Sequence, residues 1–150
     1  MLVHELTSPQ CRDVLSRSHL ARLACCRADQ PYVVPVSFTY DKESDCLFSF
    51  SEVGKKIRWM RDNPLVCLEI EDVEDRFHWT TVVVLGRYRE IDDSHEDREL
   101  RHRALHLFQG RSEWWLPGGA KVAFHEHHSI VFYRVHIESI SGRRADRDRI

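Results

Sequence analysis

The chain has 150 residues, of which 42% are hydrophobic and 31% charged, a balance typical of a folded globular protein rather than a disordered segment. The formal net charge of −2 argues against nucleic acid as a partner. No apolar run approaches the roughly 20 residues that span a bilayer, and the first residues lack the basic and apolar segments of a signal peptide. We therefore expect a cytoplasmic protein with no membrane partner, folded as a single domain over residues 1–150 with a charged, mobile tail at 142–150.

Hydrophobic patterning and turn residues predict six strands and three helices. In chain order they are a helix over 8–18, strands over 20–28, 32–40 and 46–50, a helix from 51 to 62, strands over 65–70 and 80–89, a helix over 94–108 and a strand over 130–140. Thr7 and Gln10 form a capping box for the first helix, and Ser51 is the expected cap of the second. Short turns between strands favour a mainly β (α+β) fold, an antiparallel sheet that curls into a barrel with a few flanking helices.

The five cysteines give no sign of a disulfide framework or a zinc site. Their number is odd, Cys25 and Cys26 are adjacent, and no Cys-x-x-Cys pair occurs. We expect reduced cysteines, most of them in the core.

Two lysines stand where a helix disfavours them. Lys55 and Lys56 fall in the first turn of the helix predicted over 51–62, and the whole chain has only four lysines. The N-terminus of a helix is the positive end of its dipole and presents unpaired N–H groups. An anionic ligand, with phosphate the natural candidate, removes the conflict. The alternative is a pair of solvated lysines offset by Glu52 and Asp62.

Two further features suggest a ring-shaped ligand. Pro35 interrupts a strong strand pattern, and because proline cannot donate to a sheet ladder, this strand is expected at an edge with free backbone groups. Trp114 and Trp115 lie together in an irregular stretch, either covering the core or a dimer seam or stacking near a ligand.

Six sequence motifs resemble, in their order and spacing, those of the pyridoxamine 5'-phosphate oxidase-like proteins, the FMN-binding split barrels. The similarity covers about residues 5–142, and is strongest to the small bacterial subgroup that includes nitroimidazole-resistance proteins. The motifs are Leu-Ala-Arg-Leu-Ala at 20–24, the Pro35 strand at 31–38, Gly-Lys-Lys-Ile at 54–57, Asn-Pro-Leu-Val-Cys at 63–67, Val-Val-Val-Leu-Gly-Arg at 82–87 and Ile-Ser-Gly-Arg at 140–143. The fold that the resemblance implies is a six-stranded antiparallel split β-barrel.

The resemblance also implies which residues bind the cofactor, FMN. The flavin ring would lie along the backbone of Val34, Pro35, Val36 and Ser37. The next strand would add hydroxyl or main-chain contacts from Ser49, Phe50 and Ser51. Lys55 and Lys56 would hold the phosphate, Thr81 would reach the flavin from the other subunit, and either Trp114 or Trp115 would approach the ring.

A flavin at the subunit interface of a homodimer is the arrangement that the resemblance implies, with redox chemistry on a small molecule and an electron donor such as NAD(P)H. Pyridoxamine-phosphate oxidase activity itself is not expected, because the segment from Gly142 onward lacks the tryptophan and arginine positions of that enzyme. No paired carboxylates or triad spacing identify a catalytic acid or base.

Two alternatives remain open: a non-catalytic flavin-binding module with the same site, and a haem- or metal-binding split barrel that uses histidines. The chain has ten histidines, among them His102 and His106 four residues apart on a predicted helix and the cluster at 125–128. His-Glu-x-x-His is absent, so solvated histidines and no metal site are favoured.

Overall fold

The computed structural model describes residues 1–109 and 130–147. The strands are β1 (Leu2–Glu5), β2 (Leu20–Arg27), β3 (Gln30–Ser37), β4 (Thr39–Asp41), β5 (Cys46–Glu52), β6 (Leu65–Asp75), β7 (His78–Ile91) and β8 (Ile130–Asp146). The helices are α1 (Ser8–Arg17), α2 (Lys55–Asp62) and α3 (Arg98–Gln109). None of these helices is long and apolar enough to cross a membrane.

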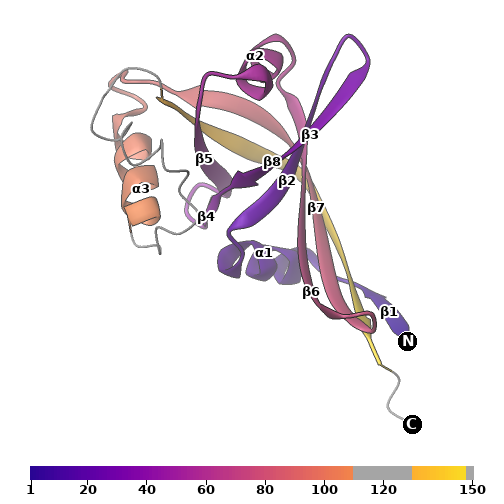
Figure 1. The fold of residues 1–150 in the computed structure, drawn as a ribbon. Coiled ribbons are helices and arrows are strands. Elements are labelled where there is room, and N and C mark those ends of the chain that lie inside the picture. The colour runs from indigo at the N-terminus through magenta and orange to yellow at the C-terminus, as the bar shows by residue number, and fades with distance from the viewer. Residues whose placement is uncertain (110–129, 148–150) are drawn as a thin grey trace.

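All the strands join one antiparallel sheet, in the order β3-β2-β6-β7-β8-β5-β4, with β1 added beside β8 (Figure 1). The long strands β7 and β8 form the centre of this order. Their register shifts between Leu85 and Gly86, where the two backbones approach closely: a Cβ added at Gly86 would overlap the carbonyl oxygen of His136. Only glycine fits this crossing without a backbone shift.

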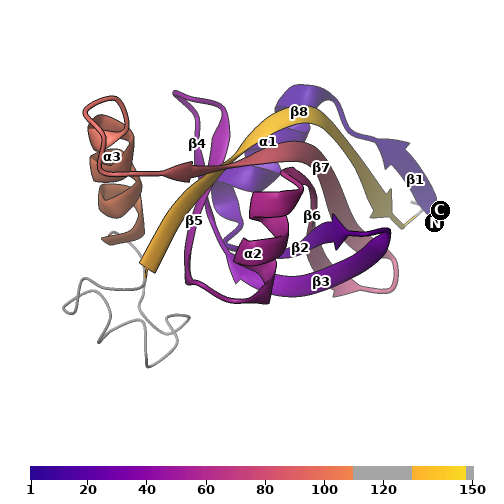
Figure 2. The same cartoon turned by 90° about the horizontal axis from the view of Figure 1, so that it is seen from above.

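The two ends of the sheet order, β3 and β4, follow one another in the chain, so the sheet curls until its ends meet at Phe38 (Figures 1 and 2). β4 pairs with only the first part of β5, as far as Phe48. Beyond that point, the Ser49 hydroxyl donates a hydrogen bond of 2.7 Å to the Ser37 carbonyl of β3. One side chain thus bridges the two strands where the barrel is split.

Within the residues that the structure describes, two hydrophobic cores lie on opposite sides of the curled sheet. The larger fills the barrel and includes side chains from α1 and α2, among them Leu15, Ile57 and Met60. The smaller lies beneath α3, where Phe108 meets Phe48 and Phe132. Figure 1 shows α1 and α2 towards opposite ends of the sheet and α3 at its side. β5 is buried on both faces because it lies between these cores.

The fold class agrees with the sequence prediction, but three details differ. The sheet has eight strands in place of six, because the predicted strand over 32–40 is divided into β3 and β4 and because β1 was not predicted. The predicted mobile tail is ordered as far as Asp146, since residues 143–146 pair with β1 on one side and β7 on the other. Ser51 does not cap α2: it belongs to β5, opposite Val131, and the helix begins after Gly54.

Candidate functional site: a cationic helix N-terminus beside an edge strand

The start of α2 combines exposed backbone donors with positive side chains. Gly54 is the N-cap and has no side chain to accept a hydrogen bond from the first turn, and that turn contains no acidic residue. The first helical bond runs from the Arg58 amide to the Gly54 carbonyl, at 3.1 Å. Amide groups that precede this bond point out of the helix end, where an anion is favoured. We call Gly54, Lys55, Lys56 and Arg58 the cationic cradle.

Lys56 is the half-buried cation of the cradle. Its ammonium donates a hydrogen bond of 2.5 Å to the Ser51 hydroxyl at the end of β5. Burial lowers the pKa of Lys56, and only an ionised Cys25 sulfur would act in the opposite direction. Because the charged ammonium is partly desolvated, an anionic ligand bound beside it would stabilise its charged form.

Cys25 lies behind the cradle, on the barrel-facing side of β2. It is 3% exposed, and burial raises the pKa of its thiol, while the positive charges of Lys56 and Lys55 lower it in part. The net effect is a neutral thiol at physiological pH, so Cys25 does not neutralise either lysine.

Lys55 is exposed and lies over two aromatic rings. Its Nζ is 4.5 Å from the ring centre of Tyr32 in β3 and 4.8 Å from that of Trp59, one turn further along α2. Both contacts hold the ammonium at the surface between α2 and β3, the two elements that Figure 2 shows beside one another.

The basic side chains of the cradle have no carboxylate partner, a property that they share in the described chain with Lys42 and with several arginines, such as Arg76 and Arg134. Within residues 1–109 and 130–147, no ion pair involves Lys55, Lys56 or Arg58, whereas most arginines are paired. The paired arginines are Arg12, Arg17, Arg22, Arg27, Arg61, Arg87, Arg89, Arg101 and Arg103. A donor set of amides, hydroxyl and ammonium without an acid suits a phosphate group.

The predicted ring-binding strand, β3, lies at the end of the sheet order, as the proline pattern indicates. Pro35 is exposed on the outer face, opposite Arg22 of β2. Val34 and Val36 point towards the barrel interior, so only their backbone is available at the edge. The carbonyl of Ser37 is already engaged by the Ser49 hydroxyl.

The three predicted residues of β5 divide between the two sides of the strand. The Ser49 hydroxyl donates a hydrogen bond to β3, and the Ser51 hydroxyl accepts one from Lys56. These two serines, at alternate positions of β5, lie on the same side of the strand. Phe50 lies on the other side, with its ring 5.0 Å from that of Phe108 of α3. Its side chain therefore packs against the smaller hydrophobic core.

Thr81 is not brought to the cradle within one chain. It lies on β7, opposite Glu71 of β6 and Arg143 of β8, and β2 and β6 separate β7 from β3. Three strand spacings amount to about 14 Å. Trp114 and Trp115, the predicted aromatic contacts, lie outside the described residues, as does the histidine cluster at 125–128.

The outer face of β3, β2, β6 and β7 carries an apolar row. Val33, Ala24, Cys67 and Leu85 are in register across these four strands, and Val33 and Leu85 are 57% and 50% exposed. We call this row the outer apolar row. Ion pairs border it: Arg22 with Glu69 and Glu71 on one side, Arg87 with Glu138 on the other. An apolar strip with a charged border is typical of a protein interface.

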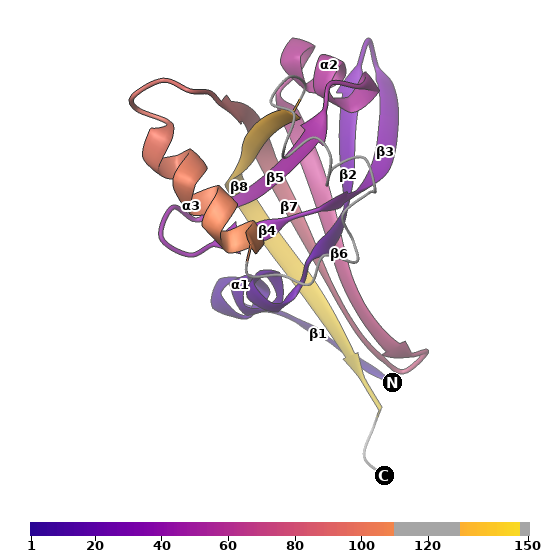
Figure 3. The same ribbon diagram turned by 60° about the vertical axis from the view of Figure 1, so that its left-hand side comes forward.

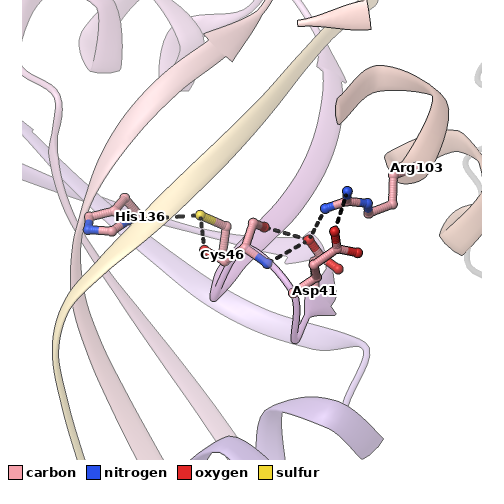
Figure 4. Close-up of polar contacts among 6 residues, drawn as sticks. Asp41, Cys46, Arg103 and His136 are labelled. Carbon is pink, nitrogen blue, oxygen red and sulfur yellow. Dashed lines mark hydrogen bonds and ion pairs between the residues drawn. The ribbon is translucent and has the colours of Figure 1, made fainter. Parts of the chain in front are cut away.

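A second polar cluster, drawn in Figure 4, lies in the turn between β4 and β5. Asp41 accepts from Arg103 of α3 at 3.1 Å and from the Ser44 amide at 3.1 Å. Burial acts to raise the pKa of Asp41, but the hydrogen bonds from Ser44 and Arg103 outweigh it, and the pKa is lowered. These contacts fix α3 against the hairpin.

Cys46 and His136 also appear in this cluster, with Sγ 3.9 Å from Nδ1 (Figure 4). Burial raises the pKa of the Cys46 thiol, which donates to the Ser44 carbonyl, so it is not an activated nucleophile. His102 and His106 are both exposed on α3. In the described part of the chain, no three His, Cys, Asp or Glu side chains gather as metal ligands.

Sequence reasoning did not single out Tyr32, Trp59, Arg58 or Cys25. A signal for Trp59 exists, because residues four apart on a helix are neighbours, which places Trp59 beside Lys55. Tyr32 comes to α2 through its pairing with Cys25 across β2 and β3, which is not readable from local sequence.

Comparisons with known proteins agree with this architecture. The model of a family described as pyridoxamine 5'-phosphate oxidase matches residues 7–144. The uncharacterized protein RA0666 of Rhizobium meliloti (strain 1021) is 38% identical over 148 residues, which are 97% of each chain. The crystal structure of an FAD-binding protein from Mesorhizobium loti is 38% identical, with a TM-score of 0.81 over 97% of this chain and 100% of that one. An FAD-binding protein from Mycobacterium smegmatis shares the fold at 22% identity, with a TM-score of 0.67 over 94% of this chain and 98% of that one.

Proposed function

Because this chain belongs to the pyridoxamine 5'-phosphate oxidase family, we propose that it is a flavin-dependent oxidoreductase that acts on a small molecule, with the flavin phosphate in the cationic cradle. The observation that carries the proposal is the cradle itself. Two lysines begin α2 and an arginine follows shortly after them, at a helix N-terminus that has no side-chain cap and no acid in the first turn. Such a cluster is unfavourable when empty and favourable when a phosphate dianion fills it.

The residues of the chain would divide the binding between them. Amide groups of the first turn and the Lys56 ammonium would hold the phosphate, with Ser51 keeping Lys56 in place through its 2.5 Å hydrogen bond. The backbone edge of β3 at Val34 and Pro35 would support the ring. A bound flavin supplies hydride or electron transfer at its ring, while the protein orients it and shields it from water.

The predicted cofactor is FMN. Its phosphate is also present in FAD, of which FMN is one half, and the FAD-binding protein from Mesorhizobium loti makes FAD the second candidate. Both place the same phosphate-bearing group in the cradle, so the proposed anchor is shared.

We further propose a homodimer that forms through the outer apolar row. Val33 and Leu85 leave much of their side chains in water in one chain, and burial in an interface would remove this cost. The row runs from β3 to β7, so a twofold interface over it would bring Thr81 of one chain towards β3 of the other. Thr81 would then contact the flavin across the interface.

The direct test is an absorbance spectrum of the purified protein with mass spectrometry of the released small molecule. We expect the near-ultraviolet and blue bands of a flavin after incubation with FMN or FAD, and reduction by NADH or NADPH followed by reoxidation by an acceptor. Binding without reduction would favour the non-catalytic flavin-binding module. A Soret band after incubation with haem, with no flavin bound, would favour the haem alternative.

The dimer is tested by sedimentation of a Leu85→Arg variant. A charge placed at the β7 end of the outer apolar row should give monomers and weaken flavin binding together. Leu2→Arg, at an exposed leucine of β1 away from the row, is a matched control that adds the same charge outside the interface. A dimer that survives Leu85→Arg contradicts the interface.

A further inference from the structure

An aromatic pair lies directly beside the cationic cradle, in contact with Lys55. Tyr32 of β3 and Trp59 of α2 have ring centres 5.5 Å apart and planes inclined at 55°. Both side chains are half-buried and pack against the barrel core. Packing therefore fixes the rings in place while part of each remains accessible to solvent.

Lys55 covers this pair in the absence of ligand. Its ammonium lies 4.5 Å from one ring centre and 4.8 Å from the other. A cation–π contact of an exposed lysine is weak, so a flat ligand ring can displace it. The displaced ammonium stays on its flexible stem, next to the first turn of α2, where a phosphate group would receive it.

We infer that Tyr32 and Trp59 stack the adenine ring of a dinucleotide whose phosphates lie in the cationic cradle, which makes FAD the preferred flavin. The inference rests on the proposed flavin site. Adenine is flat, and purine bases stack on tryptophan and tyrosine with little need for hydrogen bonds. FMN ends at its phosphate, whereas FAD continues from the same phosphate to a purine.

Lys55 lies between the proposed phosphate position at the start of α2 and the aromatic pair. It follows the N-cap of α2 directly, and it touches both rings. One side chain thus reaches from the phosphate position to the aromatic pair. NADH and NADPH also contain adenine and phosphates, so the shared chemistry is an adenine dinucleotide, and the experiment must separate the two sources.

The experiment compares equilibrium affinities for FAD, FMN and riboflavin in the wild type and in the Trp59→Leu and Tyr32→Leu variants. We expect the wild type to bind FAD at least about tenfold more tightly than FMN, as one stacked base allows. Each leucine variant should bring FAD to within about twofold of FMN, because any loss of support for Lys55 affects both flavins equally and only FAD loses a stacked base. Trp59→Phe keeps a ring and should retain most of the FAD preference.

Each other result has a distinct meaning. Equal FAD and FMN affinities in the wild type overturn the adenine subsite and leave the proposed flavin site intact. An equal decrease in the affinities for FAD and FMN in the leucine variants, with unchanged thermal unfolding, also overturns it. The rings would then support binding of the phosphate that both flavins share. If neither flavin binds the wild type, the proposed function fails. A leucine variant that raises KM for NADPH in the FMN-loaded protein but leaves FAD affinity unchanged assigns the rings to the electron donor and contradicts our inference.

Discussion

Arginine side chains are paired with carboxylates around the turn between β4 and β5, but in the described chain the basic side chains in the N-terminal half of α2 are not. In the turn, Arg12 makes a two-pronged contact with Asp45 at 2.8 and 2.7 Å, and Arg103 bonds both Asp41 and Glu43. In α2, three basic residues have no carboxylate partner in the described chain (Figure 3 shows the helix at one end of the sheet, next to β2 and β3).

We interpret this difference as a separation between charge that stabilises the fold and charge that would bind the proposed ligand. Arg12 and Arg103 connect α1 and α3 to the same hairpin, and their partners lie within the chain. A cation that is half-buried without such a partner, as Lys56 is, costs stability unless something outside the chain compensates. The comparison therefore predicts that substitutions in the hairpin act on stability and substitutions in the cradle act on flavin binding.

The largest effect is expected from the double substitution Lys55→Ala and Lys56→Ala. A hydrogen bond to a charged group contributes about 1.5–3 kcal/mol, so the flavin affinity should fall at least tenfold. The free energy of unfolding without flavin should change by no more than about 0.5 kcal/mol. Neither lysine has an ion-pair partner to lose in the described chain, and loss of the Lys56–Ser51 hydrogen bond is offset by removal of a half-buried charge.

Equilibrium titration with FMN and FAD, with urea unfolding of the flavin-free protein, measures both quantities. Lys42→Ala is the matched control, because Lys42 is an exposed lysine of the β4–β5 turn and its removal should change neither. Flavin affinity that is unaltered in the double variant would remove the two lysines from the site.

Arg103→Ala should show the reverse pattern. Its loss leaves Asp41, whose side chain is only 8% exposed, without its cation, and we expect a loss of about 1–3 kcal/mol in unfolding free energy. Because the pKa of Asp41 is lowered in the folded protein, its contribution is present above the unfolded pKa near 4 and is lost as pH falls. The unfolding free energy should therefore decrease less steeply with falling pH in Arg103→Ala than in the wild type. An identical decrease in the two proteins at acid pH would contradict the account.

The pH dependence of flavin affinity should report Lys56. Burial lowers the pKa of Lys56 in the empty site, and a bound phosphate favours the charged ammonium and raises it. Affinity should therefore decrease as pH rises through the lowered pKa. Lys56→Arg should lack this decrease, because a guanidinium stays charged. Titrations between about pH 7 and 10 compare the two proteins, and parallel curves would show that another group is responsible.

The smallest effect is expected from Arg58→Ala. Arg58 is exposed and lies past the first turn, where a solvated charge contributes about 0.2–1 kcal/mol. Flavin affinity should fall by no more than about fivefold, and added salt should reduce the difference. Arg27→Ala, which removes an arginine already paired with Asp62, should leave affinity unchanged at every salt concentration.

Local patterns were enough to predict the elements that local physics determines. The capping box of Thr7 and Gln10 is present in both directions, and Pro35 does lie on an edge strand. Lys55 and Lys56 do open α2. Each of these depends on bonds or backbone restrictions within a few residues, which a sequence displays directly.

Pairing between distant segments accounts for what sequence analysis got wrong. Ser51 has the chemistry of a helix cap, but opposite Val131 it continues β5 as a strand. The charged segment after Gly142 looks mobile, yet it is held between β1 and β7. Tyr32 reaches Trp59 only once β3 is placed beside β2. Such contacts depend on register across the sheet, which the sequence of any one segment does not contain.

The central claim is that the start of α2 holds the flavin phosphate. A crystal structure of the protein grown with excess FMN measures this directly. We predict phosphate density within hydrogen-bond distance of the Lys56 ammonium and of the amides that follow Gly54. An FMN molecule bound with its phosphate elsewhere, and only solvent at this helix end, would contradict the account.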